Sequence, residues 1–405
     1  MTKLYEQVPK DLKSNLEYRR DLLRWADTKE KQRILFTGCQ QDILFFINAF
    51  CWLYEPRSSR LRGTTSNIIP FITYGYQDTS FLDMHENLGQ RDIGIEKSRD
   101  LGATWMFLTL YFYHWMFRPM TSLGIMSRTA DLVDKPGKKD TLMWKLDFLL
   151  KGEGQSGGIP PWMRPRVYRA AMIMENQDNG SSFEGASTTE DAFRGGRKKS
   201  IAIDEYAAFP NGDDYKALAA TQHATDCRMF VSTPKGASGA YYDVMHQPSN
   251  MCKIVMDWKE HPDRKPGLYT SENGFVKILD ENYKFPDDYK FVLDGKIRSP
   301  YYDQECLRPG ATPQSIAQEL DRDYGGSEAQ IFGKDLYESA KPKLLEPYDS
   351  GMLDYDEIEL TPDYTTMPDG PFKLWCHRDA RDNPVATGQY CIGCDISAGL
   401  GGSYS

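Results

Sequence analysis

Lys97-Ser-Arg-Asp-Leu-Gly-Ala-Thr104 follows a short apolar run and precedes a strongly apolar segment that ends at Phe117. A strand, a tight loop with a glycine and a long helix form the order found in phosphate-binding loops, where backbone N–H groups and a helix N-terminus surround a polyphosphate. The usual pattern is G-x-x-x-x-G-K-[ST]. Here the same register gives K-x-x-x-x-G-A-T, so Lys97 stands at the first glycine and Ala103 at the lysine.

The displaced lysine allows two interpretations. Lys97 can reach a phosphate from the N-terminal side of the loop, because its four-carbon side chain is flexible. Alternatively, Lys97, Arg99 and Asp100 form a surface ion cluster on an ordinary turn. Under the first interpretation Arg99 clamps a phosphate or senses its loss, and Thr104 supplies a hydroxyl to Mg²⁺. The loop residues that then bind the nucleotide are Lys97, Ser98, Gly102, Ala103 and Thr104.

A second motif, Ile201-Ala-Ile-Asp-Glu205, is an apolar strand that ends in two carboxylates. Adjacent acids repel each other, so a bound cation is the natural explanation for the pair. Asp204 would hold Mg²⁺, and Glu205 would orient and deprotonate an attacking water. The alternative is a solvated turn after a strand.

A third motif, Val231-Ser-Thr-Pro234, places hydroxyls at the end of another apolar run. Ser232 and Thr233 would contact the γ-phosphate or the hydrolytic water, although Ser-Thr-Pro is also common turn chemistry. Ahead of the second motif, Ala192-Phe-Arg-Gly-Gly-Arg197 carries two arginines beside glycines. Either Arg194 or Arg197 suits an arginine finger that acts on the nucleotide of the same subunit or a neighbour.

Upstream, Pro70-Phe-Ile-Thr-Tyr-Gly-Tyr-Gln77 predicts a base-binding segment. Gln77 would contact the adenine edge, with Tyr74 or Tyr76 stacked on the ring. A buried aromatic cluster is an equally good interpretation of the two tyrosines.

The pattern along the chain predicts an α/β protein. Residues 1–60 are helical in character, and residues 66–240 alternate short apolar runs with helical segments, which is typical of βαβ units around a parallel sheet. We expect strands at 123–127, 200–204 and 228–232, a buried helix at 104–117 and a short amphipathic helix at 315–322. Residues 333–384 resemble a linker, and a last strand is expected at 390–395.

The composition limits the classes of protein to which the chain can belong. No apolar run approaches the ~20 residues that span a bilayer, and the N-terminus lacks a signal-peptide core, so we expect a soluble, intracellular protein without membrane contact. The net charge of −9 neither favours nor excludes a nucleic-acid binder. The eight cysteines are scattered. Cys391-Ile-Gly-Cys394, with Cys376 upstream, is open to a zinc site or to ordinary packing, and packing is the simpler interpretation.

Taken together, the motifs resemble a known family. Phe-Ile-Asn-Ala-Phe-Cys-Trp-Leu-Tyr-Glu-Pro-Arg, Glu-Lys-Ser-Arg-Asp-Leu-Gly-Ala-Thr-Trp, Phe-Arg-Gly-Gly-Arg, Ile-Asp-Glu and Ser-Thr-Pro occur in the order found in the large terminase subunit of tailed bacteriophages. The likeness covers residues 42 to 405. It implies a P-loop ATPase of the ASCE type with a central, mainly parallel sheet, an N-terminal helical segment and the first strand region of a truncated RNase H-like nuclease domain.

The resemblance also implies a domain order and a function. We expect a helical segment at 1–60, the ATPase domain at 61–315, a linker or lid with the start of the nuclease region at 316–384, and the beginning of the nuclease at 385–405. The implied activity is a motor that hydrolyses ATP with Mg²⁺ and moves double-stranded viral DNA into a procapsid, in the cytoplasm of the infected bacterium. The implied partners are double-stranded DNA, the portal protein and procapsid, the small terminase subunit and further copies of this chain in a ring.

Individual roles follow from the same resemblance. In some terminases the phosphate-loop lysine stands at the start of the motif, as Lys97 does. Arg99 matches the arginine within the loop, Arg194 a finger acting in trans, Gln77 the adenine-recognising glutamine, and Asp395 the first metal-binding aspartate of the nuclease. The sequence stops at Ser405, just after Asp395. Because such nucleases need several carboxylates around two metals, we expect that this polypeptide does not cut DNA unless another chain completes the site.

Two other functions remain as alternatives. A related ASCE translocase or helicase would use the same three motifs, but the region after residue 246 shows no second RecA-like domain. A non-hydrolysing assembly scaffold would explain Ala103 as the mark of a degenerate site. The intact Thr104, Asp204 and Glu205 argue against that decay.

Overall fold

The computed structural model divides the chain into two compact units, Met1–Ala329 and Gln330–Ser405, which are described separately. Arg194, Cys376, Cys391, Cys394 and Asp395 lie outside the residues that the structure describes. The described residues are 4–57, 66–154, 156–188, 192–193, 196–210, 212–326, 346–347, 349–356, 361–368 and 370–375. Within them, no helix combines the length and the apolar character that crossing a membrane requires.

An eight-stranded sheet forms the centre of the first unit, in the order β10-β3-β9-β8-β4-β7-β6-β5. Neighbours from β10 to β7 pair in parallel, whereas β6 pairs antiparallel with both β7 and β5. The strands are β3 (Ile93–Lys97), β4 (Ser122–Met126), β5 (Val167–Ala170), β6 (Ile173–Asn176), β7 (Ser181–Ala186), β8 (Ser200–Asp204), β9 (Arg228–Ser232) and β10 (Cys252–Met256).

The predicted mainly parallel α/β fold is confirmed. The runs expected at 123–127, 200–204 and 228–232 form β4, β8 and β9, and all five residues of β8 are buried, as expected for a strand covered on both faces. The antiparallel extension by β5 and β6 is a feature that the sequence did not predict. Both strands have only four residues. β6 alternates exposed and buried positions, whereas β5 has no fully buried residue.

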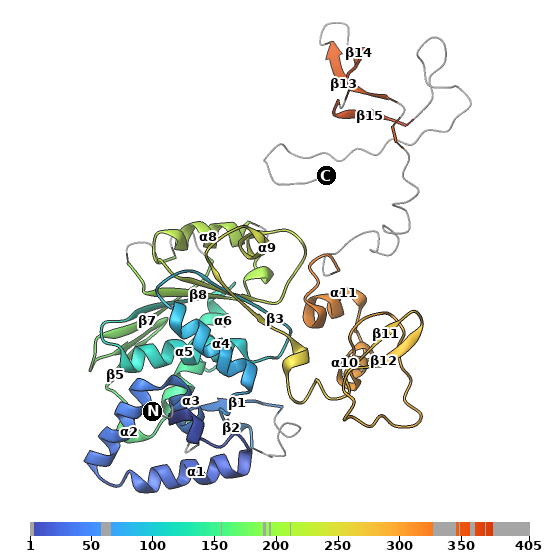
Figure 1. Ribbon diagram of the computed structural model, residues 1–405. Helices are drawn as coiled ribbons and strands as arrows, with labels where there is room; N and C mark the ends of the chain where they lie inside the picture. The colour runs from blue at the N-terminus through green and yellow to red at the C-terminus, as the bar shows by residue number, and fades with distance from the viewer. Residues whose placement is uncertain are drawn as a thin grey trace. The chain divides into compact units, whose positions relative to one another are not determined.

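Helices cover both faces of the sheet. Figure 1 shows α8 and α9 above it, and α4, α5 and the N-terminal helices below it. The expected buried helix is α5, in which 13 of 15 residues are buried, since it packs against β4 and β7 as well as α3, α4 and α7. The helices are α1 (Leu12–Trp25), α2 (Lys29–Gln41), α3 (Ile43–Phe50), α4 (Gly75–Asn87), α5 (Ala103–Phe117), α6 (Ala130–Val133), α7 (Leu142–Lys151), α8 (Asp213–Gln222) and α9 (Ala240–His246).

Short elements complete this part of the first unit. A two-stranded antiparallel ribbon lies between α3 and α4, and single 3₁₀ turns lie near the N-terminus, before β5 and after β8. They are η1 (Leu4–Gln7), β1 (Trp52–Tyr54), β2 (Ile68–Pro70), η3 (Pro161–Met163) and η4 (Tyr206–Ala208).

The segment after β10 packs around Trp258, Tyr302 and Leu320. The helix expected at 315–322 consists of a short α-helix followed at once by a π-helical turn. The elements are η5 (Trp258–Glu260), the hairpin β11 (Tyr269–Glu272) and β12 (Phe275–Ile278), α10 (Pro300–Cys306), α11 (Pro313–Ile316) and η6 (Ala317–Asp321). The described part of the second unit is an antiparallel sheet of β13 (Asp349–Asp356), β14 (Thr361–Thr366) and β15 (Phe372–Leu374).

Candidate functional site

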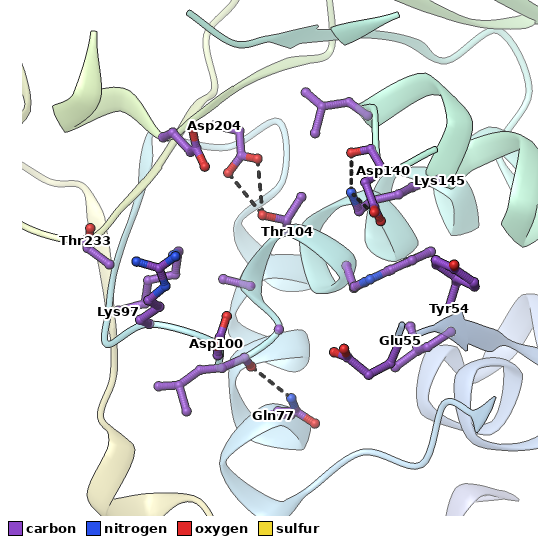
Figure 2. Close-up of a pocket in the computed structure, with 18 of the residues that line it drawn as sticks. Tyr54, Glu55, Gln77, Lys97, Asp100, Thr104, Asp140, Lys145, Asp204 and Thr233 are labelled. Carbon is purple, nitrogen blue, oxygen red and sulfur yellow. Dashed lines mark hydrogen bonds and ion pairs between the residues drawn. The ribbon is translucent and has the colours of Figure 1, made fainter. Parts of the chain in front are cut away.

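A cavity of about 760 Å³ opens at the carboxyl ends of β3, β8 and β9 (Figure 2). The structure brings the three sequence motifs together here, because the ends of parallel strands meet at one edge of a sheet. Predicted site residues that line the cavity are Gln77, Lys97, Arg99, Gly102, Ala103, Thr104, Asp204, Glu205, Ser232 and Thr233.

The loop between β3 and α5 has the geometry of an anion site. Gly102 adopts φ +81°, a left-handed conformation that glycine tolerates without strain, and α5 begins at the next residue. Within the described chain, the backbone N–H groups of residues 101–104 donate no backbone hydrogen bond. Free N–H groups at the N-terminus of a long helix attract negative charge, so this end of the cavity fits a phosphate.

Lys97 ends β3, and its ammonium is available to a ligand. Among the described residues it forms no hydrogen bond or ion pair at contact distance, although its charge acts on Asp204. The next residue is different: the Ser98 hydroxyl is fully buried, donates to the Leu320 carbonyl at 2.8 Å and accepts from the Trp258 N–H at 3.3 Å. Ser98 therefore holds the loop in place and does not line the cavity.

Other contacts fix the rest of the loop. The Arg99 N–H donates to the Glu319 carbonyl at 2.7 Å, and the Arg99 guanidinium lies 3.4 Å from the Glu319 carboxylate. The Arg264 guanidinium donates to the carbonyls of Arg99 and Asp100 at 2.8 and 2.7 Å. Burial favours the protonated form of Asp100, but the hydrogen bond from Arg57 and nearby positive charges outweigh it and lower the pKa.

Thr104 and Asp204 meet directly across the cavity. The Thr104 hydroxyl donates to the two Asp204 carboxylate oxygens, at 3.1 and 3.3 Å (Figure 2). Asp204 is buried at the end of β8, and this burial raises its pKa to about 6, even though the charges of Lys97 and Lys145 act in the opposite direction.

This pair is a suitable donor set for Mg²⁺. A hard cation prefers oxygen ligands, and magnesium is commonly held by one or two carboxylates together with waters and substrate phosphates. A buried carboxylate that favours its protonated form also has much to gain from a bound cation. Asp204 and the Thr104 hydroxyl would thus hold the metal.

Glu205 follows Asp204 and turns into the cavity through an unusual backbone. Its φ of 54° is left-handed, which is uncommon for a residue other than glycine and costs of order 1 kcal/mol. The Glu205 carboxylate is half-exposed and lies 3.6 Å from the Arg128 guanidinium. The Ser232 hydroxyl accepts from the Ala207 N–H at 3.1 Å, which ties the end of β9 to this turn.

Replacing Asp204 by asparagine is expected to stabilise the metal-free protein, although it removes the carboxylate that would hold a metal. The folded-state pKa of about 6 exceeds the ordinary value of 3.8, so the folded protein binds more protons than the unfolded one between about pH 4 and pH 6. Ionisation of Asp204 therefore lowers the free energy of unfolding as the pH rises through this window. The free energy of unfolding of Asp204→Asn should exceed that of the wild type by up to about 3 kcal/mol at pH 7.5. The difference should be smaller near pH 4.5, and urea unfolding in EDTA measures both values. An equal gain at both pH values would contradict this.

The predicted base-binding segment has its own internal contacts. The Gln77 side chain accepts from the Tyr74 N–H at 3.1 Å and donates to the Leu101 carbonyl at 3.1 Å, so it connects α4 to the phosphate loop. The Tyr74 and Tyr76 rings stack on each other with centroids 6.0 Å apart, and Tyr74 meets the His261 ring edge-on at 4.7 Å. Gln77, Tyr74 and His261 line the cavity.

Of the two candidate finger arginines, Arg197 is exposed in the segment that leads into β8, and Arg194 lies outside the described residues. Residues of the site that the sequence did not single out include Arg128, Lys145, His261, Arg264 and Glu319. Only Lys145 had a usable signal. Its neighbours Leu142, Leu146 and Leu149 are buried at helical spacing, so a lysine at 145 lies on the apolar face of α7.

Comparison with known proteins gives the family. Residues 95–268 match the family model for the N-terminal part of the large terminase subunit of the T4-like virus type. This part of the chain belongs to the large terminase family. The terminase match contains the phosphate loop, the β8 acids and the end of β9, but begins after Gln77. No curated protein matches the sequence.

Solved terminases are also similar to this chain, at low identity. The large terminase of bacteriophage HK97 has 12% identity and a TM-score of 0.40, over 54% of this chain and 44% of that one. The ATPase domain of a Thermus phage large terminase has 12% identity and a TM-score of 0.38, over 62% of this chain and 94% of that domain. A large terminase from a thermophilic bacteriophage, solved also with ADP and with ATP-γ-S, has 14% identity and a TM-score of 0.34, over 45% of each chain. The chain therefore spans less than half the length of two of these full terminases.

Proposed function

We propose that the first unit is a Mg²⁺-dependent ATPase, with the ATPase domain at 61–315. The observation that carries the proposal is the contact between the Thr104 hydroxyl and the Asp204 carboxylate at the N-terminus of α5. The Lys97 ammonium, whose charge acts on Asp204, has no contact-distance partner among the described residues. A hydroxyl, an acid and a cation around free helix N–H groups are the parts that a nucleoside triphosphate with its metal requires.

Each residue then has a chemical task. The N–H groups of residues 101–104 and the Lys97 ammonium bind phosphate oxygens, and Ser232 and Thr233 border the far side of the cavity. Bound Mg²⁺, held by Thr104 and Asp204, would neutralise charge on the phosphates. Glu205 accepts a proton from the water that attacks the terminal phosphorus, and the Arg128 guanidinium lies beside its carboxylate.

Further expectations complete the proposal at the level of the family. ATP turnover would drive double-stranded DNA into a procapsid through the portal, with the small terminase subunit as a partner and further copies of the chain in a ring. Arg99, together with Arg194 or Arg197, would supply the positive charge that stabilises the transferring phosphoryl group. Gln77 would recognise adenine, and Asp395 would ligate a nuclease metal in a complete enzyme.

The test is phosphate release by the purified chain with ATP and Mg²⁺, alone and with double-stranded DNA, portal and small subunit. We expect turnover that EDTA abolishes and that the partners increase. Nucleotide binding without turnover under every condition would instead support the assembly scaffold, and absence of binding would reject the nucleotide site.

A further inference from the structure

Lys145 is a buried cation in the cavity wall that the proposed function leaves unused. It lies on α7, its side chain is only 11% exposed, and it borders the same cavity as Lys97. Figure 2 shows Lys97 and Lys145 on opposite sides of Thr104. A lysine is rarely this buried unless it has a partner, so its contacts need an explanation.

The described partners of Lys145 leave part of its donor capacity unused. Its ammonium donates to the Asp140 backbone carbonyl, lies 3.7 Å from the Asp140 carboxylate and sits 5.7 Å from the centre of the Trp105 ring. The Asp140 side chain is 54% exposed, and ion pairs with solvated carboxylates contribute little. An ammonium has three N–H donors, so Lys145 retains capacity to bind another acceptor.

The position of Lys145 points to the terminal phosphate. Its charge acts on both Asp204 and Glu205, the residues proposed to hold the metal and the attacking water. Under the proposed function the terminal phosphate lies beside those two acids, because one would hold the metal and the other the attacking water. Ala103 occupies the usual lysine position of the loop, so Lys97 is the loop's own lysine, and Lys145 adds a second ammonium on the other side of Thr104.

We infer that Lys145 binds the terminal phosphate of a bound nucleoside triphosphate, exchanging its contact with Asp140 for the phosphate oxygens. This inference rests on the proposed ATPase function and adds a specificity to it. A diphosphate has no group at that place, so Lys145 makes the site select the triphosphate. Lys97 lies at the loop and contacts the phosphates that both nucleotides share.

The experiment compares the affinities of ADP and ATP-γ-S for the full chain in Mg²⁺ by calorimetry. Lys145→Met keeps the aliphatic packing but removes the charge. This variant should lower the affinity for ATP-γ-S about 10- to 100-fold, as expected for the loss of a charge-assisted hydrogen bond. The affinity for ADP should change less than about threefold. Lys145→Arg should retain part of the preference. Lys151→Met, an exposed position at the end of the same helix, is the matched control and should match wild type.

Other results would overturn the inference. An unchanged affinity for ATP-γ-S, or an equal loss for both nucleotides, would show that Lys145 does not distinguish the terminal phosphate. Lys145→Gln, whose amide still donates to the Asp140 carbonyl, gives the same comparison if the methionine variant does not fold. Failure of the wild-type chain to bind either nucleotide would reject the proposed function, and this inference with it.

Discussion

Glu205→Gln is expected to stop ATP turnover while nucleotide binding persists. The amide keeps the size of the side chain but cannot accept the proton of the attacking water. Loss of a positioned general base typically lowers the rate about 10²- to 10⁴-fold. The substitution leaves Lys97, Thr104 and Asp204 in place, so the affinity for ATP-γ-S should change less than about threefold, since no proposed phosphate contact is removed.

The measurement is single-turnover phosphate release together with ATP-γ-S binding. Glu175→Gln, an exposed glutamate on β6 away from the cavity, is the matched control. Wild-type turnover in Glu205→Gln would remove Glu205 from the mechanism. A strong loss of binding would instead mean that the Glu205 carboxylate itself contributes to nucleotide binding.

Lys97→Ala is expected to have the second largest effect, on both binding and turnover. The substitution removes a cation that no hydrogen bond or contact-distance ion pair of the described chain occupies. Charge-assisted contacts to phosphate contribute about 1.5–3 kcal/mol, so ADP and ATP-γ-S should both bind about 10- to 100-fold more weakly. Turnover should fall further, since the developing charge on the phosphate would lose the same partner.

The control for this variant is Lys253→Ala on the neighbouring strand β10, where the lysine is exposed and lies outside the cavity. Normal turnover in Lys97→Ala would contradict the idea that the lysine has moved to the start of the loop. In that event Lys145 on α7 would be the next candidate for the role of the loop lysine, because it borders the same cavity.

The sequence predicted the fold where burial leaves a clear pattern. β8 and β9 are buried apolar runs with polar residues at their ends, and α5 is apolar on nearly every side. The hairpin of β5 and β6 was missed because both strands are short and partly solvated: β6 alternates over only four residues, and β5 has no buried position. The change from an α-helix to a π-turn at Ala317 depends on packing that no local pattern records.

The sequence predicted those parts of the site that lie at the ends of neighbouring parallel strands. Residues at the ends of neighbouring parallel strands must lie at one edge, which placed Lys97, Asp204 and Ser232 together from the sequence. Arg264 and Glu319 reach the loop from segments more than 150 residues away, and only tertiary packing brings them there. Ser98 shows the converse: its place in the motif suggested a ligand contact, whereas the fold uses its hydroxyl internally.

The bonds on either side of Lys97 have an entropic consequence. Glu96 is held by Arg322 and Tyr324, Ser98 by Leu320, and the Arg99 N–H by Glu319. Fixing the backbone of one residue costs about 1–2 kcal/mol of conformational entropy. Because these bonds already order the loop in the folded protein, this cost does not reduce the free energy of ligand binding. The loop is preorganised, so more of its contact energy remains as affinity. Through these bonds, residues 319–324 fix the backbone conformation of the loop.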